Sequence, residues 1–289
     1  MKCIKKEDTD YPKKLLEINN PPAQIYVEGN YELLAQECFA IVGTRKATQY
    51  GTKYAKEFAK QLSKEGICII SGMALGIDTA AHIGAMKKLG RTIAVLGSGF
   101  DYIYPEENLY LYHQILENEG CIISEYPPET QMNKANFPKR NRIISGLAMG
   151  VLVVEATYRS GAVITAKLAR KQGKEIFCIP NRIDISTGYN TNELIKQGAN
   201  LVTTPEDILQ FYGMEEESNT MVNSGKEIQE KYQIIYKAIG QLPISCNEIA
   251  KFTNKSMAET MEALCMLELE GYIKNVPGNK YIRKDNNNV

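Results

Sequence analysis

The 289-residue sequence predicts an α/β fold, a doubly wound and mostly parallel sheet followed by a small second domain. Two observations predict this fold. Short apolar runs, most of them rich in Val and Ile, alternate with helical stretches, which is typical of strands buried on both faces of a sheet. A glycine commonly stands where a helical stretch ends, as a left-handed residue at a helix C-terminus requires.

The chain begins with a lead segment, residues 1–37, in which we expect a small helix and one edge strand. The regular alternation begins at Cys38 and predicts the main domain over residues 38–212. Its strands are expected at Cys38–Val42, Ile67–Ile70, Thr92–Leu96, Cys121–Ser124, Val151–Val154, Glu175–Ile179 and Ala199–Val202. Its helices are expected at Gln49–Glu65, Asp78–Leu89, Asn108–Glu119, Lys139–Ala148, Ala162–Gln172 and Asn192–Gln197.

Residues 213–227 break the alternation, because three glutamates are followed by Ser, Asn and Gly with few apolar residues. This composition predicts a flexible linker. Residues 228–289 then combine three helical patterns with two extended pieces around a Pro-Gly-Asn turn, and Ser245 with Glu248 predicts a capping box. The helices are expected at Ile228–Ile239, Cys246–Phe252 and Met257–Glu270, and the extended pieces at Tyr272–Val276 and Lys280–Arg283. Three helices and a hairpin in so short a segment predict a winged-helix domain.

Composition narrows the class of protein. The hydrophobic fraction is 44%, the mean hydropathy is −0.30, and no apolar run is long enough to span a membrane. The N-terminus turns polar too soon for a secretory signal. The seven cysteines contain no Cys-x-x-Cys pair and the two histidines have no ligand spacing. We therefore expect a cytoplasmic protein with reduced cysteines, no membrane association and no metal site.

One segment carries an unusual charge, although the formal net charge of the chain is zero. Residues 130–174 contain nine Lys or Arg and a single acid, Glu155. The segment also contains Phe137 and Asn141, an aromatic ring and an amide. A polyanion that carries bases for stacking fits this composition better than a lone phosphate does.

Within that segment the string Phe137–Arg142 is the most informative. Lys139, Arg140 and Arg142 stand at the start of an expected helix, where stability alone would favour acids. The mismatch indicates an anionic partner. The later cations of the segment, Lys167, Arg170, Lys171 and Lys174, are expected to form a solvated helix face.

Several glycine-containing loops follow the expected strands, and ligands of open parallel sheets bind at the carboxyl ends of strands. The loops are Gly43-Thr44-Arg45, Ser71-Gly72 with Gly76-Ile77-Asp78, Gly97-Ser98-Gly99, and Ser160-Gly161 with Thr165. A glycine lets a phosphate approach the backbone, and the following helix N-terminus offers N–H groups. Together the loops predict a phosphate-binding edge, whereas the P-loop and the dinucleotide fingerprint are both absent from the sequence.

Candidate catalytic groups are few. Asp78 and His82 are four residues apart on one expected helix, and Glu125 and Glu155 each end a strand. We interpret Asp78 as a helix N-terminal acid, His82 as a buried ring bonded to the backbone, and Glu155 as an anchor for the basic loop beside it. No set of nucleophile, base and orienting group can be assembled from them.

These motifs, in this order and spacing, resemble the DNA-processing protein A (DprA/Smf) family over about residues 38–210. Further strings carry the resemblance: Ser71–Asp78 with His82, Thr92–Gly97, Tyr104-Pro105, Ser124-Glu125, Phe137–Ile144 and Val154-Glu155-Ala156. The resemblance implies an extended Rossmann-like domain that binds single-stranded DNA, commonly as a homodimer. It also implies protection of incoming strands in natural transformation, loading of the RecA recombinase, no cofactor and no catalytic activity.

Motifs and resemblance together assign thirteen residues to DNA or phosphate binding and none to catalysis or metal binding. They are Gly43, Thr44, Arg45, Ser71, Gly72, Phe137, Lys139, Arg140, Asn141, Arg142, Ser160, Gly161 and Thr165.

Two other functions stay open. Glu155, Gly161 and Thr165 partly resemble the site of nucleoside-monophosphate phosphoribohydrolases, although the double-glycine phosphate loop of those enzymes is not present. A transcription factor acting through the winged helix is the other alternative. Its expected recognition helix, Met257–Glu270, has four glutamates and no Lys or Arg, which suits partner docking or self-association better than groove reading.

Overall fold

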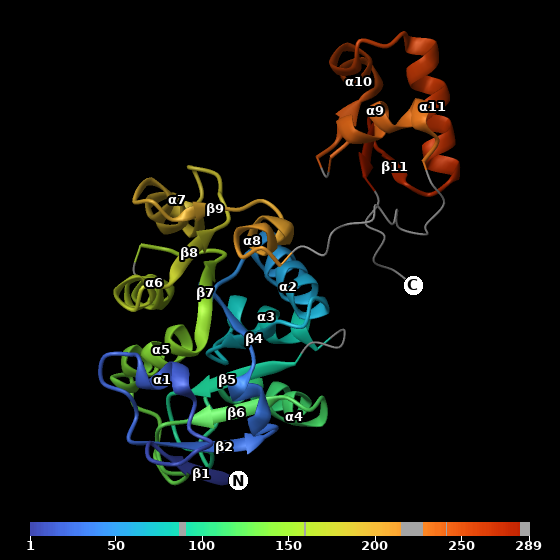
Figure 1. Ribbon diagram of the computed structural model, residues 1–289. Coiled ribbons are helices and arrows are strands. Elements are labelled where there is room, and N and C mark those ends of the chain that lie inside the picture. The colour runs from blue at the N-terminus through green and yellow to red at the C-terminus, as the bar shows by residue number, and fades with distance from the viewer. Residues whose placement is uncertain (87–90, 159, 215–227, 241, 284–289) are drawn as a thin grey trace. The chain divides into compact units, whose positions relative to one another are not determined.

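The computed structural model describes residues 1–86, 91–158, 160–214, 228–240 and 242–283 (Figure 1). The chain divides into two units, residues 1–215 and residues 216–289. The linker predicted over 213–227 therefore lies almost wholly outside the described residues, as does Arg159 of the basic segment.

A nine-stranded sheet forms the centre of the first unit, in the order β1-β2-β6-β5-β4-β3-β7-β8-β9. The six pairings from β6 to β9 are parallel, whereas β1 pairs with β2 and β2 with β6 in antiparallel fashion. The predicted doubly wound, mostly parallel sheet is thus confirmed. The strands are β1 (Lys2–Lys5), β2 (Gln24–Gly29), β3 (Cys38–Val42), β4 (Cys68–Ser71), β5 (Thr92–Leu96), β6 (Cys121–Ser124), β7 (Ala148–Val153), β8 (Glu175–Cys178) and β9 (Asn200–Leu201).

Helices cover both faces of this sheet (Figure 1). Successive residues of β3 point to opposite sides. Ala40 therefore belongs to a core cluster with residues of α1, α5, α6 and α7, and Ile41 belongs to a second cluster with residues of α2, α3 and α8. Both faces of each central strand are therefore apolar, which explains the continuous Val and Ile runs of the sequence. The helices are α1 (Lys13–Leu16), α2 (Gln49–Lys64), α3 (Ile77–Ala85), α4 (Leu109–Glu117), α5 (Asn136–Leu147), α6 (Gly161–Lys171), α7 (Tyr189–Lys196) and α8 (Pro205–Phe211).

The lead segment belongs to the same sheet. It was expected to hold one edge strand, but it contributes two, β1 and β2, because β2 bonds to β6 and leaves its own outer edge for β1. The short helix α1 packs on α5, where Gly146 makes room for Ile18: a Cβ at Gly146 would lie 2.7 Å from Ile18 Cγ2. The lead thereby helps to hold α5, the helix that carries the Phe137–Arg142 string.

The order of the sheet reverses between β3 and β7. From β3 the chain proceeds through β4, β5 and β6 in one direction, and it then returns to place β7, β8 and β9 on the other side of β3. Val42 at the end of β3 pairs with Val153 at the end of β7. The loops that leave these two strands diverge over opposite halves of the sheet, and such a switch point is where open α/β sheets bind their ligands.

The second unit contains three helices and a three-stranded sheet in the order β10-β12-β11. The predicted winged-helix arrangement is confirmed, with β10 as a third strand that the sequence analysis missed. The capping box is also confirmed: Ser245 Oγ accepts the Glu248 N–H (3.3 Å), and Glu248 accepts the Ser245 N–H (2.8 Å). The elements are α9 (Glu230–Ala238), β10 (Ile244–Ser245), α10 (Cys246–Thr253), α11 (Met257–Leu269), β11 (Ile273–Val276) and β12 (Lys280–Arg283).

The helix α8 was also missed, although its start carries a recognisable signal. Thr204 precedes Pro205, and the Asp207 carboxylate accepts the Thr204 N–H at 3.0 Å.

Within the described ranges no helix is both long and apolar enough to cross a membrane.

Candidate nucleic-acid interface

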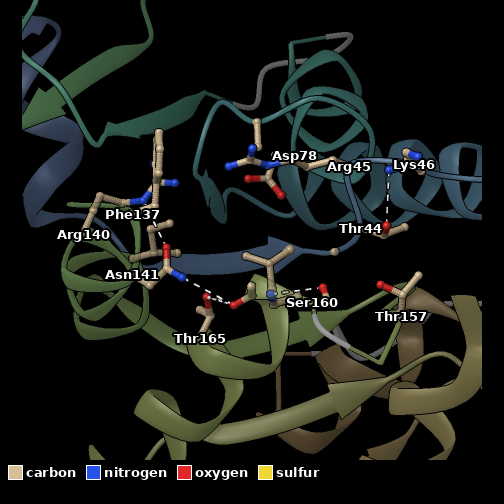
Figure 2. Close-up of a pocket in the computed structure, with 16 residues that line it drawn as sticks. Thr44, Arg45, Lys46, Asp78, Phe137, Arg140, Asn141, Thr157, Ser160 and Thr165 are labelled. Carbon is tan, nitrogen blue, oxygen red and sulfur yellow. Dashed lines mark hydrogen bonds between the residues drawn. The ribbon is translucent and has the colours of Figure 1, made fainter. Parts of the chain in front are cut away.

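A pocket of about 420 Å³ lies at the switch point of the sheet (Figure 2). Its walls come from the loop after β3, the start of α3, the helix α5, and the segment that joins β7 to α6. Its lining residues are Val42, Gly43, Thr44, Arg45, Lys46, Ala74, Asp78, Phe137, Arg140, Asn141, Ile144, Thr157, Ser160, Gly161, Ala162 and Thr165.

The loop after β3 is held by its backbone. Thr44 donates its N–H to the Glu155 carbonyl (2.8 Å) and accepts the Ile77 N–H on its own carbonyl (3.2 Å). A Cβ at Gly43 would lie 2.5 Å from the Ile77 side chain, and Gly76, at φ +81°, would place a Cβ 2.4 Å from the Thr44 carbonyl. The glycines therefore permit the close approach of two loops, which fixes the residues that follow.

Arg45 is the exposed cation that this loop presents. Its guanidinium carbon lies 5.3 Å from the centre of the Phe137 ring, within cation–π range. In the part of the chain that the structure describes, the Arg45 side chain has neither a hydrogen bond nor an ion pair. Its donors are thus available for a bidentate contact with an anion such as a phosphate.

The Phe137 ring is positioned by Gly97, which has no side chain, and by the neighbouring ring of Tyr104. A Cβ at Gly97 would lie 2.8 Å from the Phe137 ring, so the glycine after β5 makes the space that the ring occupies. Tyr104 lies on the other flank, with ring centroids 5.6 Å apart. Phe137 is only half-buried, and its ring is presented beside the Arg45 cation at the pocket.

Arg140 is buried, and it points away from solvent toward the ends of two strands. Its Nη1 donates to the carbonyls of Gly72 (2.8 Å) and Val95, and its Nε donates to Asn141 Oδ1 (3.1 Å). Gly72 is required for this position, because a Cβ there would lie 2.6 Å from the guanidinium. These carbonyls explain why the Arg140 cation is stable near the N-terminus of α5. From the sequence, the cations at this position were interpreted as a sign of an anionic partner.

Asp78 and His82 occupy the same buried region as Arg140. Burial raises the pKa of Asp78 to about 6, although the Arg140 charge and the N–H groups of Gly72, Ala74 and Gly43 oppose the rise. Burial and the Arg140 charge lower the pKa of His82 to about 3, so its ring is neutral at pH 7.

His82 bonds to a side chain rather than to the backbone that was expected. Its Nδ1 lies 2.7 Å from the Thr92 hydroxyl, and its Nε2 is buried with no hydrogen-bond partner among the described residues. The ring does not line the pocket, so His82 is a structural residue in this geometry.

The N-terminus of α6 closes the pocket opposite the β3 loop. Ser160 caps the helix by accepting the Ala162 N–H (3.3 Å), and the Gly161 carbonyl accepts from Asn141 Nδ2 and from the Thr165 hydroxyl, both at 3.4 Å. A helix N-terminus carries a partial positive charge. It adds to the charge of the pocket, where, among the described lining residues, Arg45, Lys46 and Arg140 outnumber the one carboxylate, Asp78.

Nine of the thirteen predicted residues line this one pocket. They are Gly43, Thr44, Arg45, Phe137, Arg140, Asn141, Ser160, Gly161 and Thr165. Gly72 lines a small adjoining cavity with Arg45, Phe137 and Arg140, whereas Ser71 is fully buried and donates to the Ile41 carbonyl (2.6 Å).

Lys139 and Arg142 do not line the pocket. Lys139 is exposed on α5. Arg142 points to the end of β6, where its Nη2 lies 2.5 Å from Glu125 Oε1 and both side chains are largely buried. Arg142 and Glu125 are therefore one ion pair that fastens α5 to the sheet.

Glu155 is fully buried and does not line the pocket. Its carboxylate accepts the Thr48 N–H (2.9 Å) and hydroxyl (2.6 Å), the Thr187 hydroxyl (3.2 Å) and the Asn181 amide (3.4 Å). It anchors the start of α2 and the segment after β8, whereas Arg159 of the basic loop beside it lies outside the described residues. The carboxylate on which the phosphoribohydrolase alternative depends is thus occupied in holding three strand-end loops together.

Two polar lining residues, Lys46 and Thr157, were not predicted from the sequence, and neither was the packing of the Tyr104 ring against Phe137. Lys46 directly follows Arg45, and Thr157 lies two residues after the strand-end Glu155. Their closeness in sequence to these candidate residues is the signal from which they could have been predicted. Among the described residues no group of three or more His, Cys, Asp or Glu side chains is placed to hold a metal ion.

Comparison with family models identifies both units. Residues 2–213 match the model of DNA recombination-mediator protein A, and residues 223–279 match the DprA winged helix domain. Protein Smf of Escherichia coli is 37% identical over 280 residues, covering 94% of this chain and 75% of the relative. DNA processing protein DprA of Streptococcus pneumoniae is 42% identical over 202 residues, covering 70% and 71%.

Solved structures agree with these matches. DNA processing protein A of Streptococcus pneumoniae superposes with a TM-score of 0.69 and 40% identity, covering 72% of this chain and 73% of that one. The Helicobacter pylori protein, whose structure describes a single-stranded DNA binding mode, gives a TM-score of 0.66 and 32% identity, covering 73% and 96%. The chain belongs to the DprA/Smf family of DNA-processing proteins.

Proposed function

We propose that this protein binds single-stranded DNA through the switch-point pocket and delivers it to a RecA-type recombinase during the processing of incoming DNA. The observation that carries the proposal is Arg45. It is an exposed guanidinium without a hydrogen-bond or ion-pair partner in the described part of the chain. It lies over the half-buried Phe137 ring, across the pocket from the N-terminus of α6.

The charge of the pocket favours phosphate. Burial lowers the pKa of Arg140 to about 10 against the effect of the Asp78 charge, and repulsion by the Arg45 charge adds to the lowering. An anion between the two guanidinium groups relieves that repulsion. The α6 N-terminus offers N–H groups on the opposite wall.

The aromatic ring favours a single strand over a duplex. A base that stacks on Phe137 must be unstacked from its neighbours along the strand. In a duplex the bases are stacked and paired, and they expose only their edges. The Helicobacter pylori relative is described with a single-stranded DNA binding mode, which supports the same assignment here.

A recombinase partner, a homodimeric state and a cytoplasmic location complete the proposal. The two matched family models, a recombination-mediator protein and its winged helix, support a role beside a recombinase. The cysteines in the described part of the chain are all unpaired, and five of them are buried, as in proteins of a reducing compartment.

The direct test is fluorescence anisotropy with labelled oligo-dT and with a duplex of equal length. We expect preference for the single strand, and a plot of log affinity against log salt with a slope of roughly −2 to −3, for three or four phosphate contacts. Arg45→Ala should weaken binding for all sequences and reduce the slope by about 0.7. Lys139→Ala should act in the same direction, because its exposed charge can reach a phosphate outside the pocket.

The matched control is Lys171→Ala, which removes an exposed lysine from the far end of α6. It should leave binding unchanged. Equal affinity for single strand and duplex, or an Arg45→Ala protein that binds like the parent at low salt, would refute the assignment. For the recombinase step, the growth of RecA filaments on oligo-dT is measured with and without the protein, and no acceleration contradicts that part of the proposal.

A further inference from the structure

Two exposed tyrosines outside every motif described so far, Tyr158 and Tyr189, are close to the pocket in the chain, because Tyr158 directly follows the lining residue Thr157. Tyr158 is 73% exposed and Tyr189 is 50% exposed, and their ring centroids lie 5.7 Å apart at an interplanar angle of 60°. The rings therefore support each other at the surface while much of their area faces solvent. Solvent-facing aromatic rings on a loop beside a ligand pocket are typical of a contact surface.

The backbone beneath these rings is fixed by three hydrogen bonds. Ala156 donates its N–H to the Thr187 carbonyl (2.7 Å), and Asn190 donates its own N–H to the Ala156 carbonyl (3.0 Å). The Asn190 side chain donates to the Thr157 carbonyl as well. The loop that carries Tyr158 is thus tied to the start of α7, which carries Tyr189, so the pair is preorganised before any ligand binds.

The pair is continuous with the pocket and lies at the end away from Phe137. Thr157, the residue before Tyr158, lines the pocket wall. Figure 2 shows Phe137 on one side of the pocket and Thr157 and Lys46 on the other. An extended ligand that leaves the pocket past Thr157 therefore passes from one aromatic ring, past Arg45 and Lys46, to a second aromatic platform.

We propose that Tyr158 and Tyr189 form a second base-stacking platform, which binds a nucleotide of single-stranded DNA beyond the one that stacks on Phe137. The inference rests on the proposed function of the pocket. Two platforms with cations between them match the repeat of a single strand, in which bases and phosphates alternate. A pocket of about 420 Å³ has room for only one or two nucleotides, so a longer strand must continue over the surface.

The test compares oligo-dT of about two nucleotides with oligo-dT of about ten. Tyr158→Ala and Tyr189→Ala should weaken binding of the long strand by about 5-fold to 100-fold and leave the short one unchanged, because one stacked base is lost. Tyr158→Phe, which keeps a ring, should bind like the parent. Tyr110→Ala is the matched control: Tyr110 is also 50% exposed, but it lies on α4 and does not line the pocket.

A spectroscopic readout is available because the chain has no tryptophan. The single indole of Tyr158→Trp should lose fluorescence when the long strand is added and should not respond to the short one. The inference is overturned if the parent binds the long strand and the Tyr158→Ala, Tyr189→Ala double variant binds it equally well, or if the indole signal stays constant at saturation. If the parent binds no single strand at all, the proposed function of the pocket fails instead.

Discussion

Asp78 should make DNA binding depend on pH. Its pKa is raised from 3.8 to about 6 by burial, so about 3% of the carboxyls are protonated at pH 7.5 and about three quarters at pH 5.5. Among the described residues that line the pocket, Arg45, Lys46 and Arg140 stand against this one acid, so their side chains together carry +2 when Asp78 is ionised and +3 when it is protonated. The affinity for a phosphate should therefore rise as the pH falls through 6.

The size of the effect follows from Coulomb's law. One unit charge acting on a phosphate about 8 Å away is worth ~2 kcal/mol at an effective dielectric constant of about 20, and salt reduces this to ~1 kcal/mol. The corresponding change in affinity is about 5-fold to 30-fold. Asp78→Asn removes the charge and keeps an oxygen that can accept the Gly72 N–H, which lies 3.2 Å from Oδ2 in the parent. At pH 7.5 the variant should therefore bind more tightly than the parent, by a factor in this range.

The assay is fluorescence anisotropy with oligo-dT at constant ionic strength between pH 5.5 and 7.5, since thymine does not titrate in that window. Parent and variant should converge at the acid end and diverge as the pH rises. A change that both proteins share comes from groups elsewhere and is removed by the comparison. Parallel pH profiles for the two proteins would refute the reasoning, because Asp78 would then carry no charge that the strand senses.

Three further predictions concern stability and are checked by thermal melting. Arg142→Ala leaves Glu125 without its partner 2.5 Å away, and we expect a loss of ~1–3 kcal/mol with little change in oligo-dT affinity; a large affinity loss in a fully folded variant would contradict this. Glu155→Gln places an amide donor against groups that themselves donate, and it should lower the melting temperature by about 4–10 °C; an unchanged midpoint would mean that the carboxylate is not an anchor. Gly51→Ala would place a Cβ 2.3 Å from Glu155 Oε2 and should also destabilise the fold, whereas Gly161→Ala, with open space around its Cβ position, should not.

The main sheet was predictable because strands buried on both faces must be apolar at every position. The lead segment was harder, since an antiparallel strand such as β2 carries only a partial apolar pattern and its place beside β6 is a long-range pairing. Register and strand order depend on such pairings and leave little local signal.

In the site, the residue types that bind anions could be predicted from the sequence, but the directions in which their side chains point could not. Lys139, Arg140 and Arg142 are neighbours in sequence, but each residue turns about 100° around a helix, so they face three ways. Only Arg140 faces the pocket, and it is buried there against carbonyls that come from distant strands. Tyr158 and Tyr189 belong to no motif, and only the fold brings them together.

The reversal of strand order between β3 and β7 has a consequence for unfolding. Arg45 comes from the first half of the sheet, and Ser160 and the α6 N-terminus come from the second, so the site exists only while the β3–β7 seam is closed. A strand bound across the seam acts as a clamp between the two halves. Added DNA should therefore slow hydrogen exchange most strongly in β3 and β7, because the bound strand stabilises the contact between the two halves of the sheet.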